Sequence, residues 1–442
     1  MHRPEADPVE TGQAGTFIKA YIEIAEPKHG IALRELCPHA TEVVKELQDA
    51  GYEAYIVGGG VRDLLLGKAP KDFDVATSAT PEEVRDIFPR CHLIGRRFRL
   101  AHVRKKGTLI EVATFRGHNA EENDREKLNG RILRDNVWGS VEEDAIRRDF
   151  TINAMFLDPV NGTIRDYVGG YRDLMEKKLR LIGDPVVRYR EDPVRLLRAA
   201  RFVAKLDVEP DQGTEQPIRT LAPLLDNIPP ARLFEEVCKL FLTGHGLRSL
   251  DALQRFGLSA SLFPLLAVEG ECGRIAMGTL LRKALENTDA RIREGKPVTP
   301  AFLLAVLFWR PVKERTEALI TGGVALFDAL SAAADEVFYL QSKTTAVPRR
   351  FSSMCKQIWA LQWRLKKISG RRWKRLLGEQ RFRAAYDFLL LRAEQDPSLA
   401  ELADFWTRAQ EGAPVPPAEG NEKKPVRCRR PRTRRGGAAV RF

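Results

Sequence analysis

Apolar residues in the first part of the chain follow helical spacing in some segments and form short strand-like runs in others. Spacing of three to four residues predicts a helix over His39–Gly51, with the glycine at its end. Tyr55–Val57 predicts a strand that runs into Gly58–Gly60, and Val61–Leu66 predicts the next helix. Phe73–Ala76 predicts a second strand. The order of these elements indicates a mixed α/β beginning.

A capping motif and a hairpin extend this pattern. Thr80–Glu83 has threonine, proline and glutamate at capping-box spacing and opens a helix that ends near Phe88. Leu100–Arg104 and Leu109–Phe115 flank Lys105–Gly107, which predicts a β-hairpin. The first 115 residues therefore predict an α/β head built on a small sheet.

After Val141 the pattern turns mostly helical. Pro229-Pro230 predicts a helix start. Ala301–Trp309 and Arg383–Glu394 predict buried helices. A small head followed by a long helical part places the chain in the α+β class, and no repeat of fixed period is present.

Charge is concentrated at the C-terminal end. Asn421–Phe442 has two lysines, seven arginines and one glutamate, so it carries a net charge of +8 out of +12 for all 442 residues. Such a segment has few apolar residues to bury and predicts a disordered basic tail. Nucleic acid is the expected partner, because neutralised phosphates release counterions. The alternative is a tail that only improves solubility.

Cysteine usage and hydropathy indicate a soluble cytoplasmic protein. The six cysteines are scattered and form no C-x-x-C pair, which favours free thiols over disulfides or a zinc ribbon. The longest apolar run, Ala301–Trp309, is far shorter than the roughly 20 residues of a membrane span. The N-terminus has no apolar stretch typical of a secretory signal. We expect no transmembrane segment.

The glycine-rich turn suggests an anion site. Three consecutive glycines between a strand and a helix leave backbone N–H groups free to face a phosphate, and Arg62 lies in the first helical turn. The block is no Walker A loop, because Gly67-Lys68 is followed by Ala69. It is no dinucleotide fingerprint, because position 63 is Asp63. The alternative interpretation is a tight turn without a ligand.

Three acids follow the glycine turn. Asp72 and Asp74 are two residues apart on a predicted strand, so their side chains should share a face. Side by side they repel unless a cation lies between them. Glu111 is an acid within an apolar strand and is expected to face the same pocket. Carboxylates at one site suit Mg²⁺, whereas the alternative for the pair is an Asp-rich turn that caps the next element.

Two later blocks combine cations and acids. Arg147–Asn153 places them on one short helical stretch, which indicates either ribose and phosphate contacts or surface ion pairs. Asp192, Arg195 and Arg198 are spaced i, i+3 and i+6 on a predicted helix. An acid and an arginine there could satisfy the N6 and N1 groups of adenine. The alternative is an amphipathic helix whose charges follow its dipole.

In this order, these blocks resemble the class II nucleotidyltransferases, which are the bacterial poly(A) polymerases and the tRNA CCA-adding enzymes. The resemblance runs from about Tyr55 to Leu206. It implies a polymerase β-like head and a role for each matched residue. The resemblance implies a triphosphate loop at Gly58, Gly59 and Arg62. It implies a metal-binding pair of catalytic acids at Asp72 and Asp74 and a third catalytic acid at Glu111. It also implies that Arg148 and catalytic Asp149 contact the nucleotide sugar and phosphates, and that the nucleobase is selected by Asp192, Arg195 and Arg198.

Other blocks resemble the poly(A) polymerases more than their CCA-adding relatives. These are Leu93–Val103, Ile228–Glu236, Arg381–Asp387 and the arginine-rich end, and no His-Asp dipeptide of an appended hydrolase domain occurs. The stretch His118–Arg131 is shorter than in the relatives, so its loop contacts do not carry over. The expected domains are an extension (1–39), the head (40–186), a helical neck for nucleobase and RNA (187–280), a helical RNA-binding body (281–412) and the tail (413–442).

The resemblance implies transfer of AMP from ATP to RNA 3′ ends, with release of pyrophosphate, which marks RNA for decay. It implies two Mg²⁺ ions, for which Mn²⁺ can substitute, and a cytoplasmic monomer. It leaves open peripheral membrane association and partners among RNA-decay helicases and nucleases. One rival is a CCA-adding enzyme, which would also take CTP and stop after three additions. A second rival is a non-catalytic RNA-binding adaptor, against which the three intact acids argue.

Overall fold

The computed structural model of the chain describes residues 21–95, 99–117, 127–128, 131–132, 137–267, 275, 278–368 and 372–412. Contacts divide the chain into two compact units. Unit 1 comprises Met1–Ala276, Leu285–Val298 and Tyr339–Val347, and unit 2 comprises Met277–Ala284, Thr299–Phe338 and Pro348–Phe442. The shortened stretch His118–Arg131 and the basic tail fall almost wholly outside the described residues.

Within the described residues, unit 1 contains a mixed sheet of eight strands in the order β1-β10-β9-β2-β3-β6-β5-β4. The strands are β1 (Ile22–Ile24), β2 (Ala54–Val57), β3 (Asp74–Thr77), β4 (Cys91–Ile94), β5 (Leu100–Lys105), β6 (Thr108–Thr114), β9 (Met155–Asp158) and β10 (Thr163–Asp166). Two short pairs are separate from it, β7 (Lys127–Leu128) with β8 (Arg131–Ile132), and β11 (Lys178–Leu179) with β12 (Glu209–Pro210).

The register at the centre of the sheet brings two predicted acids together. Strand β3 runs antiparallel to β2, with Val57 opposite Asp74. On its other side β3 runs parallel to β6, with Asp74 opposite Glu111. The predicted hairpin over β5 and β6 is confirmed, and Lys106 at its turn has a positive φ of 45°. The small mixed sheet expected for the head is therefore present.

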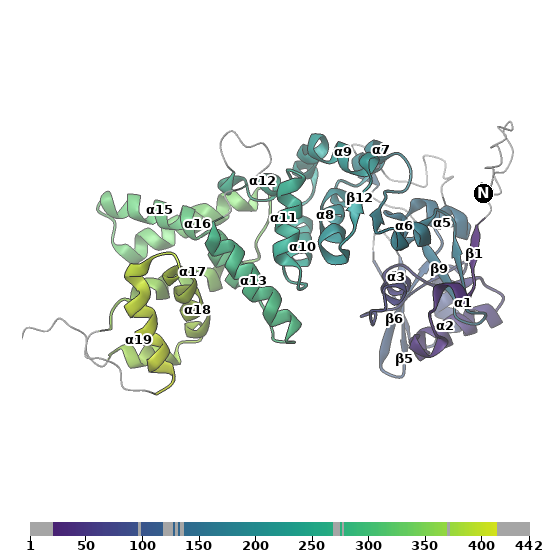
Figure 1. Ribbon diagram of the computed structural model, residues 1–442, viewed down its shortest axis with the longest axis horizontal. Coiled ribbons are helices and arrows are strands. Elements are labelled where there is room, and N and C mark those ends of the chain that lie inside the picture. The colour runs from purple at the N-terminus through teal and green to yellow at the C-terminus, as the bar shows by residue number, and fades with distance from the viewer. Residues whose placement is uncertain are drawn as a thin grey trace, which may run out of the picture. The chain divides into compact units, whose positions relative to one another are not determined.

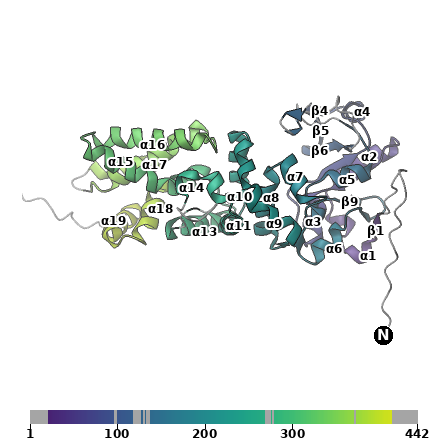
Figure 2. The ribbon, with the colours of Figure 1, turned by 90° about the horizontal axis from the view of Figure 1, so that it is seen from above.

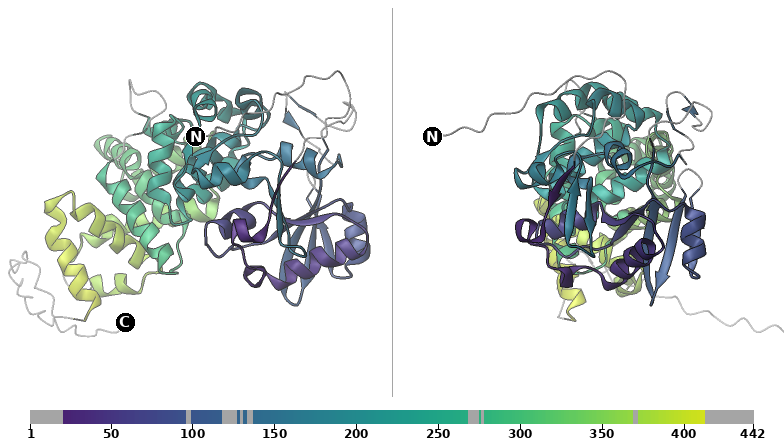
Figure 3. Two further views of the ribbon diagram at one scale, coloured as in Figure 1. Left: turned by 45° about the vertical axis from the view of Figure 1, so that its right-hand side comes forward. Right: turned by 90° about the vertical axis from the view of Figure 1, so that its right-hand side faces the viewer.

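Short helices alternate with these strands along the chain. They are α1 (Glu26–His29), α2 (Pro38–Asp49), α3 (Gly59–Leu65), α4 (Pro81–Ile87), α5 (Val141–Arg147) and α6 (Gly170–Met175). Helix α2 contacts β2, β3 and β6, and α4 lies beside β4, β5 and β6 (Figure 2). Val141 and Ala145 of α5 pack on the sheet residues Tyr55 and Val57. Figure 3 shows α2, in purple, along the strands of the head.

The predicted capping box of α4 is confirmed. The Thr80 hydroxyl accepts the Glu83 N–H at 3.3 Å, and the Glu83 carboxylate accepts the Thr80 N–H at 2.7 Å. Each partner satisfies a backbone donor that the helix itself leaves free. The helix starts at Pro81, as the sequence pattern predicts.

Strands β1, β4, β9 and β10 of the sheet were not among the predicted strands. The expectation of mainly helical structure after Val141 is wrong for β9 and β10, which extend the head sheet beyond β2. All four residues of β9 are buried, so its apolar run lacks the alternation that marks a strand. The expected N-terminal extension (1–39) contributes a strand to the sheet, since β1 pairs with β10 from Ile22 to Ile24. A three-residue edge strand is too short to show a period.

The rest of unit 1 is helical. Its helices are α7 (Pro185–Glu191), α8 (Val194–Leu206), α9 (Gln212–Leu221), α10 (Pro230–Phe241), α11 (Gly246–Arg255) and α12 (Ser259–Leu262). Helices α8, α10 and α11 lie side by side (Figure 1) and contact one another. The predicted helix start at Pro229-Pro230 is confirmed by α10. Helices α13 (Thr279–Arg293) and α16 (Leu326–Ser342) each contribute residues to both units.

Unit 2 is built on buried aromatic residues. Its helices are α14 (Pro300–Leu307), α15 (Trp309–Thr321), α17 (Arg349–Leu365), α18 (Phe382–Ala393) and α19 (Ala400–Gln410). Trp359 of α17 donates to the Ala305 carbonyl of α14 at 2.9 Å, and Trp406 of α19 donates to the Leu365 carbonyl at 3.0 Å. The two predicted buried helices are confirmed as α14 and α18. No helix in the described part of the chain is long and apolar enough to cross a membrane.

Candidate nucleotide-binding cleft

The glycine turn connects β2 to α3, as the sequence predicts. Gly58 has φ +73° and ψ −133°, a backbone conformation that a side chain would strain. A Cβ at Gly58 would lie 3.5 Å from Nη1 of Arg148. Arg62 of α3 is 3% exposed and donates from Nη1 to Oδ1 of Asn153 at 2.6 Å. The turn therefore presents backbone next to two arginines.

Asp74 begins strand β3, but Asp72 precedes it. The expectation that both acids lie on the strand is therefore wrong for Asp72, which is exposed in the connecting segment. A Cβ on Gly60 would lie 3.6 Å from Cδ1 of Phe73, so the segment before β3 closely approaches the start of α3. Burial raises the pKa of Asp74 to about 6, Glu111 and Asp72 add to the rise, and Arg148 opposes it. The three acids thus share one electrostatic environment.

Glu111 lies opposite Asp74 in the sheet and is half exposed. Its Oε1 is 3.3 Å from Nε2 of His102 on the neighbouring strand β5. It does not line the cleft described below, although its charge reaches Asp74. The structure therefore places Glu111 near the pair of aspartates, at the rim of the site.

The donors at this position fit a divalent cation. Among the residues that the structure describes, no group of three or more histidine, cysteine, aspartate or glutamate side chains is arranged to hold a metal ion. Mg²⁺ in nucleotide-dependent enzymes commonly uses one or two carboxylates together with substrate phosphates and water. The charges of Glu111 and Asp72 disfavour the ionised form of Asp74, and a bound cation would favour that form instead.

Arg148 lies just beyond α5, so the expected single helical stretch over Arg147–Asn153 is wrong. Helix α5 ends at Arg147, Arg148 is extended with ψ 170°, and a 3₁₀ turn covers Thr151–Asn153. The Arg148 guanidinium donates to Asp144 at 2.9 and 3.1 Å and lies 4.9 Å from the centroid of the Phe156 ring. These contacts fix its direction toward the glycine turn.

Asp149 is held from three sides. Its Oδ1 accepts the Phe150 N–H at 2.7 Å and the Asn153 amide at 3.1 Å. Its Oδ2 accepts Nε of Arg198 at 2.6 Å. Burial alone would raise the pKa of Asp149, but Arg198 and these hydrogen bonds outweigh it and lower the pKa. The carboxylate is thus ionised and can accept a hydroxyl of a bound sugar.

The predicted base-reading residues lie on two elements. Asp192 follows α7 with extended backbone, φ −143° and ψ 91°, and Arg195 and Arg198 lie on α8. The expectation of one continuous helix is wrong, because Pro193 cannot continue α7. Asp192 accepts from Arg232 of α10 at 2.9 Å.

Arg195 is oriented by the end of α7. Its Nη1 donates to the Arg188 carbonyl at 2.7 Å and lies 3.3 Å from the Glu191 carboxylate. Arg188 itself donates to the backbone carbonyls of Arg147 and Arg148, both at 2.6 Å. The start of α8 is therefore tied through Arg188 to the segment that carries Asp149.

One cleft of about 580 Å³ in unit 1 brings most of these residues together. The predicted residues that line it are Gly58, Gly59, Arg62, Asp74, Arg148, Asp149, Asp192, Arg195 and Arg198. Arginines and lysines outnumber acids in this lining, which suits a polyanion such as a triphosphate. Asp72 and Glu111 are absent from the lining. Their role at the site remains a prediction.

Several other residues of the lining have no individual role in the prediction from sequence. They are Asn153, Arg201, Phe202, Lys205, Arg232 and Lys239, together with the acids Glu235 and Glu236. Arg201 and Lys205 continue the helical spacing of Arg195 and Arg198 along α8, so that spacing could have identified them. The lining residues of α10 begin at Arg232, 34 positions after Arg198 in sequence. Only the packing of α10 on α8 brings them to the cleft.

Phe202 organises the cations of the cleft. The guanidinium carbons of Arg62, Arg198 and Arg201 lie 5.4, 5.5 and 5.1 Å from its ring centroid. Cations near an aromatic ring gain an attraction that partly offsets their mutual repulsion. The aromatic ring thus lets three arginines converge on one ligand.

Comparison with known proteins identifies the three parts of the chain. Residues 54–180 match the poly A polymerase head domain, residues 207–269 the probable RNA and SrmB-binding site of polymerase A, and residues 322–437 the polymerase A arginine-rich C-terminus. Poly(A) polymerase I of Salmonella typhi is 48% identical over 400 residues, covering 88% of this chain and 86% of that protein. The Haemophilus influenzae enzyme is 46% identical over 415 residues, covering 92% and 91%.

The CCA-adding enzymes are similar over less of the sequence. The enzyme of Geobacillus thermodenitrificans is 40% identical over 232 residues, which is 52% of this chain. A solved structure of the Bacillus stearothermophilus CCA-adding enzyme in complex with CTP aligns with a TM-score of 0.58 and 28% identity, covering 85% of this chain and 83% of that one. Similarity to poly(A) polymerase I spans nearly the whole chain, whereas sequence similarity to this CCA-adding enzyme spans about half. The chain therefore belongs to the bacterial poly(A) polymerase family of class II nucleotidyltransferases.

Proposed function

We propose that the protein adds adenylates to RNA 3′ ends without a template, with ATP as the donor. The cleft carries this proposal, because it joins a glycine turn, two partly buried aspartates and a cation-rich helical face in one space. The near full-length similarity to poly(A) polymerase I supports the same activity. Adenylate addition of this kind would mark RNA for decay.

The reaction forms a phosphate ester bond and breaks a phosphoanhydride bond. The RNA 3′-oxygen attacks the α-phosphorus of ATP, the bond to the β-phosphate oxygen breaks, pyrophosphate leaves, and the hydroxyl proton passes to solvent. Two divalent cations, Mg²⁺ or Mn²⁺, held by Asp72 and Asp74 with Glu111 nearby, would neutralise phosphate charge and lower the pKa of the 3′-hydroxyl. The protein itself supplies position and fixed charge.

Different cleft residues contact different parts of the nucleotide in this proposal. The backbone of Gly58 and Gly59 faces the triphosphate, and Arg62 and Arg148 can contact its oxygens. Asp149 accepts a ribose hydroxyl, since its carboxylate is ionised and already oriented by three donors. Asp192, Arg195 and Arg198 line the same cleft and select the nucleobase.

A gel assay separates this activity from CCA addition. A short unstructured RNA is incubated with each of the four nucleotides in turn, and product length is measured. A poly(A) polymerase gives a long ladder with ATP alone and little extension with CTP. A CCA-adding enzyme would extend the RNA with CTP alone and stop after a short fixed extension, and an RNA-binding adaptor would give no product with any nucleotide.

The cellular setting of this activity is also a proposal. We infer a cytoplasmic monomer that acts with RNA-decay proteins such as a helicase or a nuclease. Co-purification of the full chain with and without ribonuclease treatment distinguishes direct partners from those bridged by RNA.

Truncation after Pro416 is expected to weaken RNA binding while the first adenylate is still added. The removed residues carry most of the excess positive charge, and no residue proposed for chemistry lies there. Losing phosphate contacts should also flatten the dependence of log Kd on log salt concentration, because fewer counterions are released on binding. A full-length control with the tail arginines replaced by glutamine should behave like the truncation. Unchanged affinity at about 50 mM salt in both variants would show that the tail does not bind RNA.

A further inference from the structure

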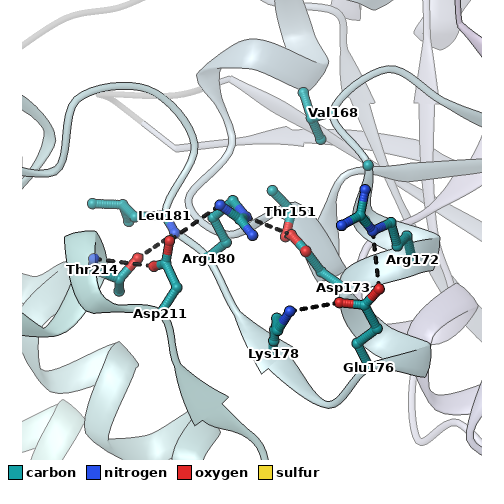
Figure 4. Close-up of polar contacts among 12 residues, drawn as sticks. Thr151, Val168, Arg172, Asp173, Glu176, Lys178, Arg180, Leu181, Asp211 and Thr214 are labelled. Atoms are coloured by element: carbon teal, nitrogen blue, oxygen red, sulfur yellow. Dashed lines mark hydrogen bonds and ion pairs between the residues drawn. The ribbon is translucent and has the colours of Figure 1, made fainter. Parts of the chain in front are cut away.

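Arg180 joins two parts of unit 1 through a pair of carboxylates. Its Nε donates to Oδ2 of Asp173 in α6 at 3.1 Å, and its Nη1 donates to Oδ2 of Asp211 at 3.2 Å, just before α9 (Figure 4). Asp173 is 4% exposed and also accepts the buried Thr151 hydroxyl at 2.7 Å. One guanidinium thus connects the segment after Asp149 with the start of α9.

The segment after Asp149 has a backbone connection to Arg180 as well. Ile182 donates to the Asp149 carbonyl at 2.9 Å, and Thr151 donates to the Arg180 carbonyl at 3.0 Å. Helix α6 presses on the same segment, because a Cβ on Gly170 would lie 2.0 Å from the Thr151 carbonyl oxygen. The position of Asp149 therefore follows the position of residues 180–182.

The α9 end of the bridge leads to the base-reading residues. Asp211 caps α9 by accepting the Thr214 N–H at 3.1 Å, and the Thr214 hydroxyl accepts the Leu181 N–H at 2.9 Å. The Thr214 carbonyl accepts the Tyr189 hydroxyl at 3.0 Å. Tyr189 belongs to α7, which ends next to Asp192. The segment that carries Asp149 and the end of α7 next to Asp192 are therefore both connected to the residues that Arg180 contacts.

We propose that Arg180 is a positioning residue which, by bridging Asp173 and Asp211, sets the sugar-binding Asp149 at a fixed distance from the base-reading end of α7. This inference rests on the proposed function for the roles of Asp149 and Asp192. The side chain of Arg180 hydrogen-bonds to Asp173 and Asp211, neither of which lines the cleft, so it acts through the segments that it joins.

The bridge adds orientation more than stability. The Arg180 side chain is 44% exposed and that of Asp211 is 25% exposed, and ion pairs exposed to solvent contribute little to folding. The pairing of β11 with β12 and the buried Thr214 already hold the same joint. Planar guanidinium geometry can satisfy two carboxylates in fixed directions, which an ammonium cannot.

Asp211→Asn is the primary test, because it cuts the bridge without leaving Asp173 unpaired. The asparagine oxygen can still accept the Thr214 N–H and cap α9, while its amide presents a donor to Arg180. We expect the KM for ATP to rise roughly tenfold, since small displacements of positioning groups have effects of this size. The KM for RNA and the Tm should stay close to wild type.

Two further variants complete the test. Arg180→Lys keeps the charge but not the planar fork, so its KM for ATP should lie between wild type and Asp211→Asn. Arg172→Ala is the matched control. Arg172 is an exposed arginine of α6 whose side chain pairs with Glu176 in the same view (Figure 4). It should leave both KM values unchanged.

The outcomes separate this inference from the proposed function. If Asp211→Asn lowers kcat in proportion to its folded fraction and leaves the KM for ATP unchanged, the bridge is only structural and the inference fails. If the wild-type protein adds no nucleotide, the proposed function fails instead. The inference is then tested by ATP binding in the absence of RNA. Asp211→Asn should raise the Kd for ATP roughly tenfold relative to Arg172→Ala, and an unchanged Kd would contradict the inference.

Discussion

Asp74→Ala is expected to abolish adenylate addition while the protein stays folded. Asp74 lies at the start of β3, lines the cleft and faces the charges of Glu111 and Asp72. Lewis-acid stabilisation by a bound cation contributes several kcal/mol, and each 1.4 kcal/mol is about tenfold in rate. We therefore expect at least about a thousandfold loss of kcat with Mg²⁺. Asp72→Ala should behave in the same way, measured by primer extension.

Stability should change in the opposite direction from activity. The pKa of Asp74 rises from 3.8 to about 6 on folding, so the folded protein binds more protons than the unfolded chain between these values. Stability therefore falls as pH rises from about 4 to about 6, and the penalty stays complete at neutral pH. Without divalent cations, Asp74→Ala should accordingly have a higher Tm than wild type at pH 7. The difference should vanish near pH 4.

Cation binding provides the control for this prediction. Mg²⁺ should raise the Tm of the wild type and not that of Asp74→Ala, because the cation binds only the folded carboxylates. Asp86→Ala removes an exposed aspartate of α4 instead and should leave activity and the Mg²⁺ response unchanged. Near-native activity of Asp74→Ala with Mg²⁺ would show that the acid does not serve the cation.

Local sequence signals predicted the elements that carry the site, and failed where tertiary packing decides. The glycine turn, the Thr80 capping box and the hairpin of β5 and β6 each depend on neighbouring residues, so the sequence predicts them. Strand β9 is buried on both faces and shows no alternation. Strand β1 is fixed only by its partner β10, 140 positions away in sequence. No local pattern contains that information.

The same distinction holds within the cleft. The resemblance to the class II nucleotidyltransferases predicted that Asp74, Asp149 and Arg198 belong to one site, and all three line the cleft. The conformations near them were not predicted, since Pro193 separates Asp192 from α8 and Arg148 leaves α5. Arg232 reaches Asp192 only because α10 packs on α8. Ion-pair partners across helices depend on the fold, which sequence spacing does not give.

Replacing Asp192 is expected to relax base choice more than it slows the reaction. Asp192 can accept from the N6 amino group of adenine, and Arg195 can donate to N1. Guanine presents an acceptor at O6 and a donor at N1, so it meets the wrong partner at both positions. A buried polar group left unpaired costs about 1–3 kcal/mol, which corresponds to roughly ten- to a hundredfold discrimination per contact. Asp192→Ala should therefore lower the ratio of kcat/KM for ATP to that for GTP by about this factor.

Asp192→Asn and Arg232→Ala distinguish base reading from bracing. The asparagine amide can donate to O6 of guanine, so Asp192→Asn should favour GTP more than Asp192→Ala does. Arg232→Ala removes the ion pair at 2.9 Å but keeps the Asp192 carboxylate in the lining of the cleft. If Asp192 only braces α7 against α10 through this pair, then Arg232→Ala and Asp192→Ala should slow ATP, CTP and GTP equally and lower the Tm together. An ATP-to-GTP ratio that stays at the wild-type value in both Asp192 variants would exclude base reading by this residue.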